Sequence, residues 1–234
     1  SPHYLRFTAK QAGEGFSNKA YTGIFLKKGM DYKISFYARM AGYKGNLKVS
    51  VVKDGKNNGT AEIACIHVPQ GEWQKWNRYE AVLHASEDVK HALFVITLEE
   101  PGCVEFDHIS MMPGDAVAGI FRKDLFEKLK ELKPGFLRFP GGCIIEGNTL
   151  SNRYRFKNSL GAPEERISNW NRWAVHQNGP ENDCRSIYSH YNQTLGLGYY
   201  EYFLLCELIG AKPLPVLSVG LACQYMSCEL VSMD

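Results

Sequence analysis

Apolar and polar residues alternate along most of the first half of the chain. The clearest run covers residues 31–40, whose apolar members are Tyr32, Ile34, Phe36, Ala38 and Met40. A period of two predicts a β-strand with one buried and one solvated face. Similar runs occupy residues 4–9, 21–26, 46–53, 61–68, 73–84, 91–98 and 104–111, with Gly-containing turn signals between several of them. About eight short strands without a helical stretch predict an antiparallel β-sandwich, most simply a jelly roll, over residues 1–113.

The pattern changes after Pro113 to helices that alternate with short apolar strands. Residues 123–133 place four apolar side chains at helical spacing, and Pro134-Gly135 ends this predicted helix. A strand at 136–139, a polar loop over about 141–189, an apolar helix at 197–209 and a strand at 214–219 follow. Because both strands are continuously apolar, the order predicts a parallel sheet covered by helices over residues 114–234.

Composition and charge narrow the class of partner. The chain is 44% hydrophobic and 22% charged, which is typical of a folded globular protein and not of a disordered one. Its 27 Lys and Arg against 25 Asp and Glu leave no basic face, so we expect neither a nucleic acid nor a membrane as partner. No apolar run approaches the length of a transmembrane helix.

Cysteine and histidine spacing gives no sign of a cofactor. The 7 cysteines and 7 histidines form no CxxC, HExxH or HxH pair. No phosphate loop or Gly-x-Ser-x-Gly elbow is present either. We therefore predict no metal or other cofactor, and we expect mostly reduced thiols.

Candidate chemistry gathers in the block Arg-Phe-Pro-Gly-Gly-Cys-Ile-Ile-Glu-Gly-Asn, residues 138–148. A buried strand delivers Arg138 to its C-terminal end, and the two glycines that follow permit a tight turn. The carboxyl ends of strands form the active sites of α/β barrels, so Arg138, Glu146 and Asn148 predict recognition of a hydroxyl-rich ligand. A simple ion pair between Arg138 and Glu146 is the alternative. Cys143 is interpreted as a neutral thiol that is buried or faces the ligand.

The loop that follows is rich in aromatic and amide side chains, which suit stacking on a sugar face or, alternatively, the packing of the loop itself. These residues are Asn169, Trp170, Asn171, Trp173 and His176.

Five blocks in this half of the chain together resemble the alpha-L-arabinofuranosidases of glycoside hydrolase family 51. They are residues 132–148, 170–173, 188–192, 198–202 and 210–220. The resemblance is strong over about residues 121–225. Residues 4–113 resemble the carbohydrate-binding-module-like, galactose-binding-like jelly roll that many members carry after their first barrel strand. The resemblance therefore implies a β-sandwich followed by the first part of a (β/α)8 TIM barrel.

The resemblance also implies an activity and a set of site residues. Such a parent protein would remove terminal non-reducing arabinofuranosyl residues from arabinan, arabinoxylan or arabinogalactan with retention of configuration. Arg138 would lie in the sugar subsite and support the nucleophile, and Cys143 stands where some members carry an asparagine that contacts the substrate. Glu146, Asn148 and Trp173 fall on the substrate side. An arabinose-containing polysaccharide or oligosaccharide is the implied partner; a homo-oligomer is compatible with it, and an extracellular or periplasmic location is expected.

The same resemblance requires two catalytic glutamates, one of them in an Asn-Glu pair, on later barrel strands. No Asn-Glu pair occurs in the sequence. Glu164 and Glu165 are interpreted as solvated loop charges, and Glu201 and Glu207 lie on the predicted helix, with Glu207 as a surface charge. A complete barrel needs roughly 250 residues, whereas about 120 follow Pro113. We therefore expect both catalytic carboxylates to be absent, the chain to be inactive alone, and parallel strand edges to stay open.

A non-catalytic carbohydrate-binding β-sandwich is the alternative function. Trp73 and Trp76, with Tyr21, Tyr37 and Tyr43, would form its stacking platform. However, two residues three positions apart in a regular strand point to opposite faces, so at least one tryptophan is expected in the core. A structural insert is therefore the favoured role of this domain.

Overall fold

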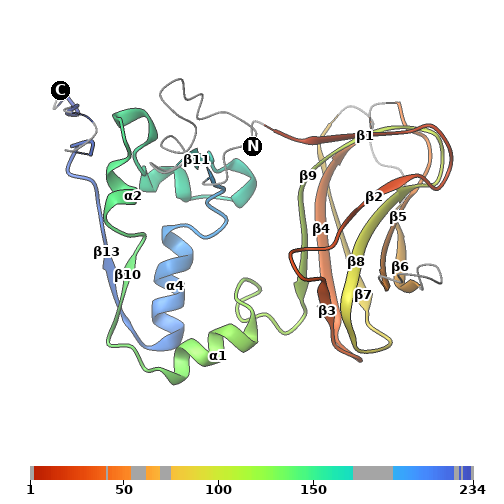
Figure 1. Cartoon of the computed structure of the whole chain (residues 1–234), viewed down its shortest axis with the longest axis horizontal. Helices are drawn as coiled ribbons and strands as arrows, with labels where there is room; N and C mark the ends of the chain where they lie inside the picture. The colour runs from red at the N-terminus through yellow and green to blue at the C-terminus, as the bar shows by residue number, and fades with distance from the viewer. Residues whose placement is uncertain are drawn as a thin grey trace. The chain divides into compact units, whose positions relative to one another are not determined.

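The computed structural model describes residues 3–40, 42–53, 62–68, 75–170, 192–223, 227 and 229–232. Contacts divide the chain into two compact units, residues 2–125 and 126–234, which are described separately. Figure 1 shows the strands of the first unit and the mixed helices and strands of the second. The last strand of the first unit ends at Pro113, and the domain limits 1–113 and 114–234 remain a prediction.

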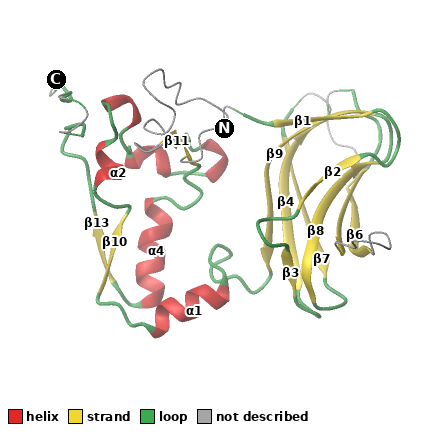
Figure 2. Cartoon of the chain, in the orientation of Figure 1, coloured by secondary structure: helices red, strands yellow, loops and turns green. Residues whose placement is uncertain are grey.

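The first unit is an antiparallel β-sandwich, as predicted. One sheet has the strand order β1-β9-β4-β7, and the other has the order β2-β8-β5-β6 with β3 also paired to β8 (Figure 2). The strands of the described residues are β1 (Leu5–Ala9), β2 (Gly15–Asn18), β3 (Ile24–Leu26), β4 (Asp31–Arg39), β5 (Leu47–Lys53), β6 (Glu62–Val68), β7 (Asn77–His84), β8 (Val89–Leu98) and β9 (Gly102–Pro113).

Alternate side chains of the two sheets meet in one core. On β4, Ile34 and Phe36 are almost fully buried, while Lys33, Ser35 and Tyr37 are more exposed. Val49 and Ile96 from the second sheet join the same cluster. Alternation along the sequence is therefore converted directly into a two-layer core, because successive strand side chains point to opposite faces.

Two predicted strands differ from the structure, and one strand was missed. β2 was missed because Phe16 is its single large apolar residue, too little for a period to be visible. The strand predicted at 21–26 is shorter, β3, and Tyr21 before it is 99% exposed. The strand predicted from Trp73 begins at Asn77 in the structure, and Trp73 itself lies outside the described residues.

The second unit is built around a parallel strand pair. Helix α1 (Lys123–Glu131) leads into β10 (Phe136–Phe139), and helix α4 (Tyr199–Ile209) leads into β13 (Lys212–Pro215). β10 and β13 pair in parallel, with Arg138 opposite Leu214. Because α4 connects the two strands and packs against both, this is the β–α–β arrangement predicted for the second half.

The strand predicted at 214–219 lies earlier in the chain, at β13. Pro213 and Pro215 interrupt its sequence and have no N–H to donate. The ladder uses other donors, since the Lys212 N–H bonds to the Gly135 carbonyl and the Val216 N–H bonds to the Phe139 carbonyl. Pro213 and Pro215 therefore occupy positions that donate no hydrogen bond to β10. Their presence is the reason that the start of the strand was predicted too late in the chain.

Short elements replace much of the polar loop predicted after β10. They are helix α2 (Cys143–Glu146), the 3₁₀ turns Leu150–Asn152, Phe156–Ser159 and Pro163–Glu165, and the two-residue strands β11 (Asn169–Trp170) and β12 (Asn192–Gln193). Ile145 of α2 and the loop residues Tyr154 and Leu195 join β10 and α4 in a small core of Phe139, Ile145, Tyr154, Leu195, Tyr199 and Cys206.

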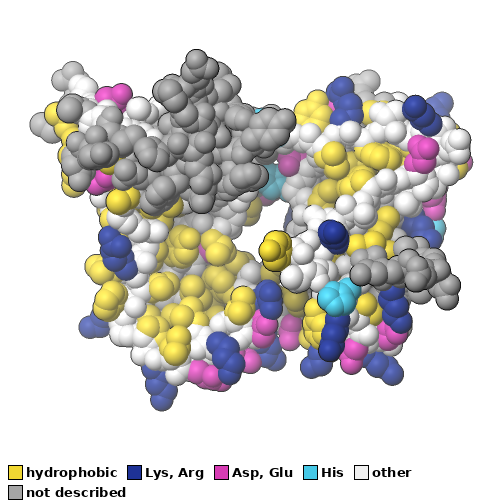
Figure 3. All heavy atoms as spheres, in the orientation of Figure 1, with side chains coloured by type: hydrophobic (Ala, Val, Ile, Leu, Met, Phe, Trp, Pro, Cys, Tyr) yellow, Lys and Arg dark blue, Asp and Glu magenta, His cyan; other side chains and the backbone are white. Residues whose placement is uncertain are grey.

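The second unit leaves strand edges and apolar side chains uncovered. Among the described residues, neither β10 nor β13 has a second strand neighbour. Phe136 on β10 is 60% exposed, and Val219 after β13 is 94% exposed. Figure 3 shows hydrophobic side chains gathered on the visible face of this unit. None of the helices in the described part of the chain has the length and apolar content to cross a membrane.

Candidate functional site

The site begins at the C-terminal end of β10, where the chain turns at two glycines. Gly141 has a φ of 140°, which side-chain-bearing residues rarely adopt. A Cβ added to Gly142 would lie 3.2 Å from Nη2 of Arg138. The exposed guanidinium of Arg138 therefore rests against bare backbone, and the glycines explain how the strand-end arginine is accommodated.

The other predicted site residues follow on and after α2. Cys143 is an exposed free thiol, Glu146 is half-buried, and Asn148 is buried. Among the described residues, no ion pair joins Arg138 to Glu146, so the alternative of simple mutual pairing is not realised. Trp173, together with Asn171 and His176, lies outside the described residues.

Asn152 fixes the turn that carries Asn148. Its side chain is buried, and its Oδ1 accepts hydrogen bonds from the N–H groups of Asn148 at 2.8 Å and Thr149 at 3.1 Å. Gly147 has a φ of 69°, and a Cβ there would lie 2.6 Å from the same Oδ1. The turn is therefore closed by one side-chain oxygen and one glycine, which holds Glu146 and Asn148 in fixed positions on either side.

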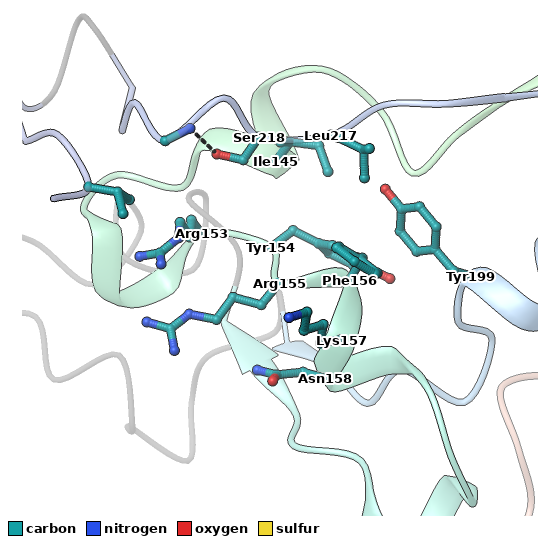
Figure 4. A pocket seen from close by; sticks show the side chains of 12 residues that line it. Ile145, Arg153, Tyr154, Arg155, Phe156, Lys157, Asn158, Tyr199, Leu217 and Ser218 are labelled. Carbon is teal, nitrogen blue, oxygen red and sulfur yellow. Dashed lines mark hydrogen bonds between the residues drawn. The ribbon is translucent and has the colours of Figure 1, made fainter. Parts of the chain in front are cut away.

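A cavity of about 470 Å³ opens beside this turn, and Figure 4 shows the side chains around it. Its volume is in the range of small-molecule sites. The lining comes from α2, residues 153–158, the start of α4 and the segment after β13. The residues are Ile145, Arg153, Tyr154, Arg155, Phe156, Lys157, Asn158, Tyr199, Leu217, Ser218, Gly220 and Val231.

This lining was not anticipated from the sequence. Arg138, Cys143, Glu146 and Asn148 all lie outside it, although Ile145 of the same helix is part of it. The only sequence signal is the alternation of cationic and aromatic residues over 153–157, which lies inside the stretch that was predicted to be a polar loop. The residues after β13 meet residues 153–158 at the cavity only in the folded chain, so their order in the sequence does not reveal the shared lining.

Cationic side chains and the neutral phenol groups of Tyr154 and Tyr199 line the cavity. Burial raises the pKa of Tyr199 to about 12, and its hydroxyl donates to the Val216 carbonyl. Burial likewise raises the pKa of Tyr154. Burial, and secondarily the charge of Arg155, lowers the pKa of Arg153, whose Nη1 donates to the Leu150 carbonyl at 2.7 Å. No carboxylate is among the described residues that line the cavity, and the cationic and hydroxyl groups that do line it can form hydrogen bonds with a hydroxyl-rich ligand.

A buried ion pair holds the start of α4 next to this cavity. Arg166 donates two hydrogen bonds to Glu201, at 2.7 and 3.0 Å, and the two side chains are only 2% and 6% exposed. Arg166 also donates to the carbonyls of Gly161 and Leu195 at 2.8 Å each, and the Gly198 N–H donates to Glu201 at 2.7 Å. Burial favours a higher pKa for Glu201, but these hydrogen bonds outweigh it and lower the pKa. Glu201 is therefore a charged structural carboxylate.

The other acidic candidates lie apart from the cavity lining. Glu165 and Glu207 are exposed, Glu207 on α4 as the predicted surface charge. In the part of the chain that the structure describes, no three His, Cys, Asp or Glu side chains are grouped as a metal ion would require.

The platform predicted for the sandwich is wrong in one member. Tyr43 is 1% exposed, and its hydroxyl donates to the Asn46 carbonyl at 2.6 Å, so it belongs to the core. Tyr21 and Trp76 are exposed, while Tyr37 is half-buried.

Comparison with known proteins shows which proteins the chain resembles. The family model of the alpha-L-arabinofuranosidase 1 domain matches residues 128–234. The chain is 32% identical to alpha-L-arabinofuranosidase 1 of Arabidopsis thaliana over 90% of this chain and 29% of that protein. It is 34% identical to the extracellular exo-alpha-L-arabinofuranosidase of Streptomyces chartreusis over 88% of this chain and 24% of that protein. The chain thus spans less than a third of the length of these curated relatives.

A solved structure shares the fold of both units. The arabinose-bound MgGH51 a-L-arabinofuranosidase matches 98% of this chain and 36% of its own chain, with a TM-score of 0.79 and 24% sequence identity. The predicted fold class, an antiparallel sandwich followed by an α/β segment, is confirmed by this likeness and by the strand topology. Within the second unit, the described residues contain one parallel strand pair and its helices, and the barrel stays a prediction.

Proposed function

We propose that the chain is part of an alpha-L-arabinofuranosidase of glycoside hydrolase family 51, and that the whole protein is a retaining arabinofuranosidase, because the family model and the curated relatives agree in this similarity. It releases terminal non-reducing alpha-L-arabinofuranosyl residues from arabinose-containing polysaccharides or oligosaccharides. The observation that carries this proposal is the family match over residues 128–234, which contains the strand-end arginine and its glycine turn.

The contribution of this chain is to one side of the sugar subsite. Arg138 presents five N–H donors at the end of β10, in the position from which barrel enzymes contact their substrates. The Asn152 turn fixes the backbone that carries Asn148 and, before it, Glu146, and we propose that both face the same subsite. Cys143 offers an exposed thiol, a weaker hydrogen-bonding group than an amide. Trp173 is proposed to stack on the sugar from the loop that follows.

The catalytic carboxylates are proposed to lie outside this chain. A retaining glycosidase needs two carboxyl groups about 5–5.5 Å apart. Glu201 has both oxygens engaged by Arg166 and the α4 N-terminus, and the cavity lining contains no acidic side chain among the described residues. We therefore propose that residues 114–234 form the early part of the barrel, that residues 1–113 form an attached sandwich domain, and that the chain alone binds arabinosides without hydrolysing them.

The test separates binding from turnover. The purified chain is assayed for hydrolysis of an aryl arabinofuranoside and, by calorimetry, for binding of an arabino-oligosaccharide. We expect no turnover and measurable binding that Arg138→Ala weakens about tenfold or more, the loss of a charge-assisted contact. Arg122→Ala is the matched control, because Arg122 is exposed and pairs with Asp124. Turnover that disappears in Glu165→Gln or Glu201→Gln would place the catalytic pair inside this chain and contradict the proposal.

A further inference from the structure

The outer face of the sheet β1-β9-β4-β7 contains a buried carboxylate. Glu105 lies between Val104 and Phe106 on β9, and both of these neighbours belong to the core. Alternation along the strand turns Glu105 to the opposite face, where a side chain is normally wet. The Glu105 side chain is nevertheless only 3% exposed. A layer of other side chains must therefore cover this face of the sheet.

Two arginines from the neighbouring strands hold Glu105. Arg6 on β1 and Arg39 on β4 stand opposite Glu105 in the strand register. Arg6 Nε donates to Oε1 at 2.9 Å, and Arg39 Nε donates to Oε2 at 2.5 Å. The hydrogen bond from Arg39 is the main cause that lowers the pKa of Glu105. The carboxylate thus stays charged and fixes two guanidinium groups side by side across three strands.

Two aromatic side chains complete this layer. The rings of Tyr4 and Trp76 meet edge to face with centroids 5.7 Å apart. Cζ of Arg39 lies 5.1 Å from the Trp76 ring centroid and 5.7 Å from that of Tyr4, in cation–π range. Tyr4 is 45% exposed and Trp76 is 36% exposed. We call Tyr4, Arg6, Arg39, Trp76 and Glu105 the arginine–aromatic patch.

The patch keeps unused hydrogen-bond donors beside exposed ring surface. Arg39 donates a hydrogen bond to the described residues from Nε only, so none of those residues occupies its two terminal amino groups. None of them occupies Nη1 of Arg6 either. Two guanidinium charges against one carboxylate leave a surplus of one positive charge. A guanidinium fork matches a planar carboxylate in a bidentate way, and an aromatic ring offers an apolar surface to the C–H face of a sugar.

We propose that the arginine–aromatic patch binds a glycan through a sugar that carries a carboxylate, that is, a uronic acid residue. The sugar ring packs against Trp76 and Tyr4, and its carboxylate accepts hydrogen bonds from the free donors of Arg39 and Arg6. This site lies on the sandwich, uses none of the residues assigned to the arabinofuranosyl subsite, and does not depend on the activity proposed above.

Calorimetry of the full chain with two matched oligosaccharides tests the proposal. One is a neutral xylo-oligosaccharide, and the other is the same oligosaccharide with a single glucuronic acid branch. We expect the acidic ligand to bind at least about tenfold more tightly than the neutral one, with a preference that shrinks as salt is added. Trp76→Ala should weaken the acidic ligand about tenfold. Arg39→Lys keeps a charge beside Glu105 but lacks the fork, so it should remove most of the preference.

Arg78→Gln is the matched control. Arg78 is an exposed arginine of the same sheet that pairs with Glu80 instead of Glu105, so its removal should leave binding unchanged. Thermal unfolding of each variant verifies that the sandwich is intact. Equal affinity for the two oligosaccharides, no heat of binding at millimolar acidic ligand, or an equal loss in Arg78→Gln would overturn the proposal. Arg138→Ala should not affect this binding, which keeps the result separate from that for the arabinofuranosyl subsite.

Discussion

Removal of the Arg166 side-chain charge should strongly destabilise the second unit. Arg166→Met keeps a long apolar side chain but deletes the donors to Glu201, Gly161 and Leu195. Among the described residues, Glu201 would then be a buried carboxylate held only by backbone N–H groups, those of Gly198 and of Glu201 itself. Breaking a buried ion pair by removing one partner costs about 3–5 kcal/mol. Because native domains are stable by only about 5–15 kcal/mol, this loss brings the second unit close to unfolding.

The double variant shows whether the cause is the unpaired charge. Arg166→Met combined with Glu201→Leu removes both charges, so no buried carboxylate is left without a partner. We expect it to regain at least about 2 kcal/mol relative to Arg166→Met, because apolar replacement of both partners of a buried pair is often close to neutral. The carbonyls of Gly161, Leu195 and Gly196 lose Arg166 as a donor in both variants, at about 1–3 kcal/mol for each that stays dry and unsatisfied. The comparison therefore isolates the carboxylate.

Urea unfolding, combined with hydrogen exchange of the α4 segment, measures these differences. The exchange readout is needed because the two units can unfold separately, and a whole-chain signal would mix them. Arg122→Met is the matched control, since Arg122 is exposed in its pair with Asp124, and exposed pairs contribute about 0–1 kcal/mol. A change below about 1 kcal/mol in Arg166→Met, or a double variant as unstable as the sum of its single variants, would refute the reasoning.

Three further predictions follow from the same geometry. Folding lowers the pKa of Glu201, so the contribution of Glu201 to stability should be present above an unfolded pKa of about 4.3 and should disappear as the pH falls through the folded pKa. Urea titrations at several pH values should show this fall in the wild type and not in Glu201→Leu. Gly198→Ala should destabilise α4, since its Cβ would lie 2.0 Å from the Ser159 carbonyl oxygen, whereas Gly196→Ala meets nothing closer than 3.6 Å and should melt like the wild type. Tyr43→Phe should lower the free energy of unfolding of the sandwich by about 1–3 kcal/mol, because the Asn46 carbonyl loses its buried donor; an unchanged midpoint in urea would contradict this.

The parts of the fold that could be predicted are those governed by local periodicity. The alternation on β4 and the helical spacing of α1 need only neighbouring residues, and both elements are found where expected. β2 could not be predicted, because a four-residue strand with one large apolar side chain has no period. β13 was displaced because its prolines disguise a strand whose donors are supplied by Lys212 and Val216.

The site residues likewise fall into two groups: those whose arrangement follows from residues near in the sequence, and those whose arrangement depends on residues far away in it. Arg138 and its glycines are contiguous in sequence, so their geometry could be anticipated from chain chemistry alone. The cavity could not, because Tyr199 and the residues after β13 reach it only once the parallel pair has formed. Arg166 gave no signal, since its partner Glu201 is 35 positions away. Glu105 likewise depends on arginines 99 and 66 positions away.

The two proposed sugar sites differ in what holds them, and this decides how each behaves in the isolated chain. The arginine–aromatic patch stands on a sandwich whose core is continuous and whose strands are paired on both sides of Glu105. The proposed arabinofuranosyl subsite is supported by the Arg166–Glu201 pair and by one parallel strand pair, which has no further strand neighbour among the described residues. Parallel sheets are normally covered on both faces, so the second site should gain rigidity when further barrel strands are present. Affinity at Arg138 should therefore rise in a longer protein, whereas affinity at Arg39 should not change, because the groups that position Arg39 are already complete in this chain.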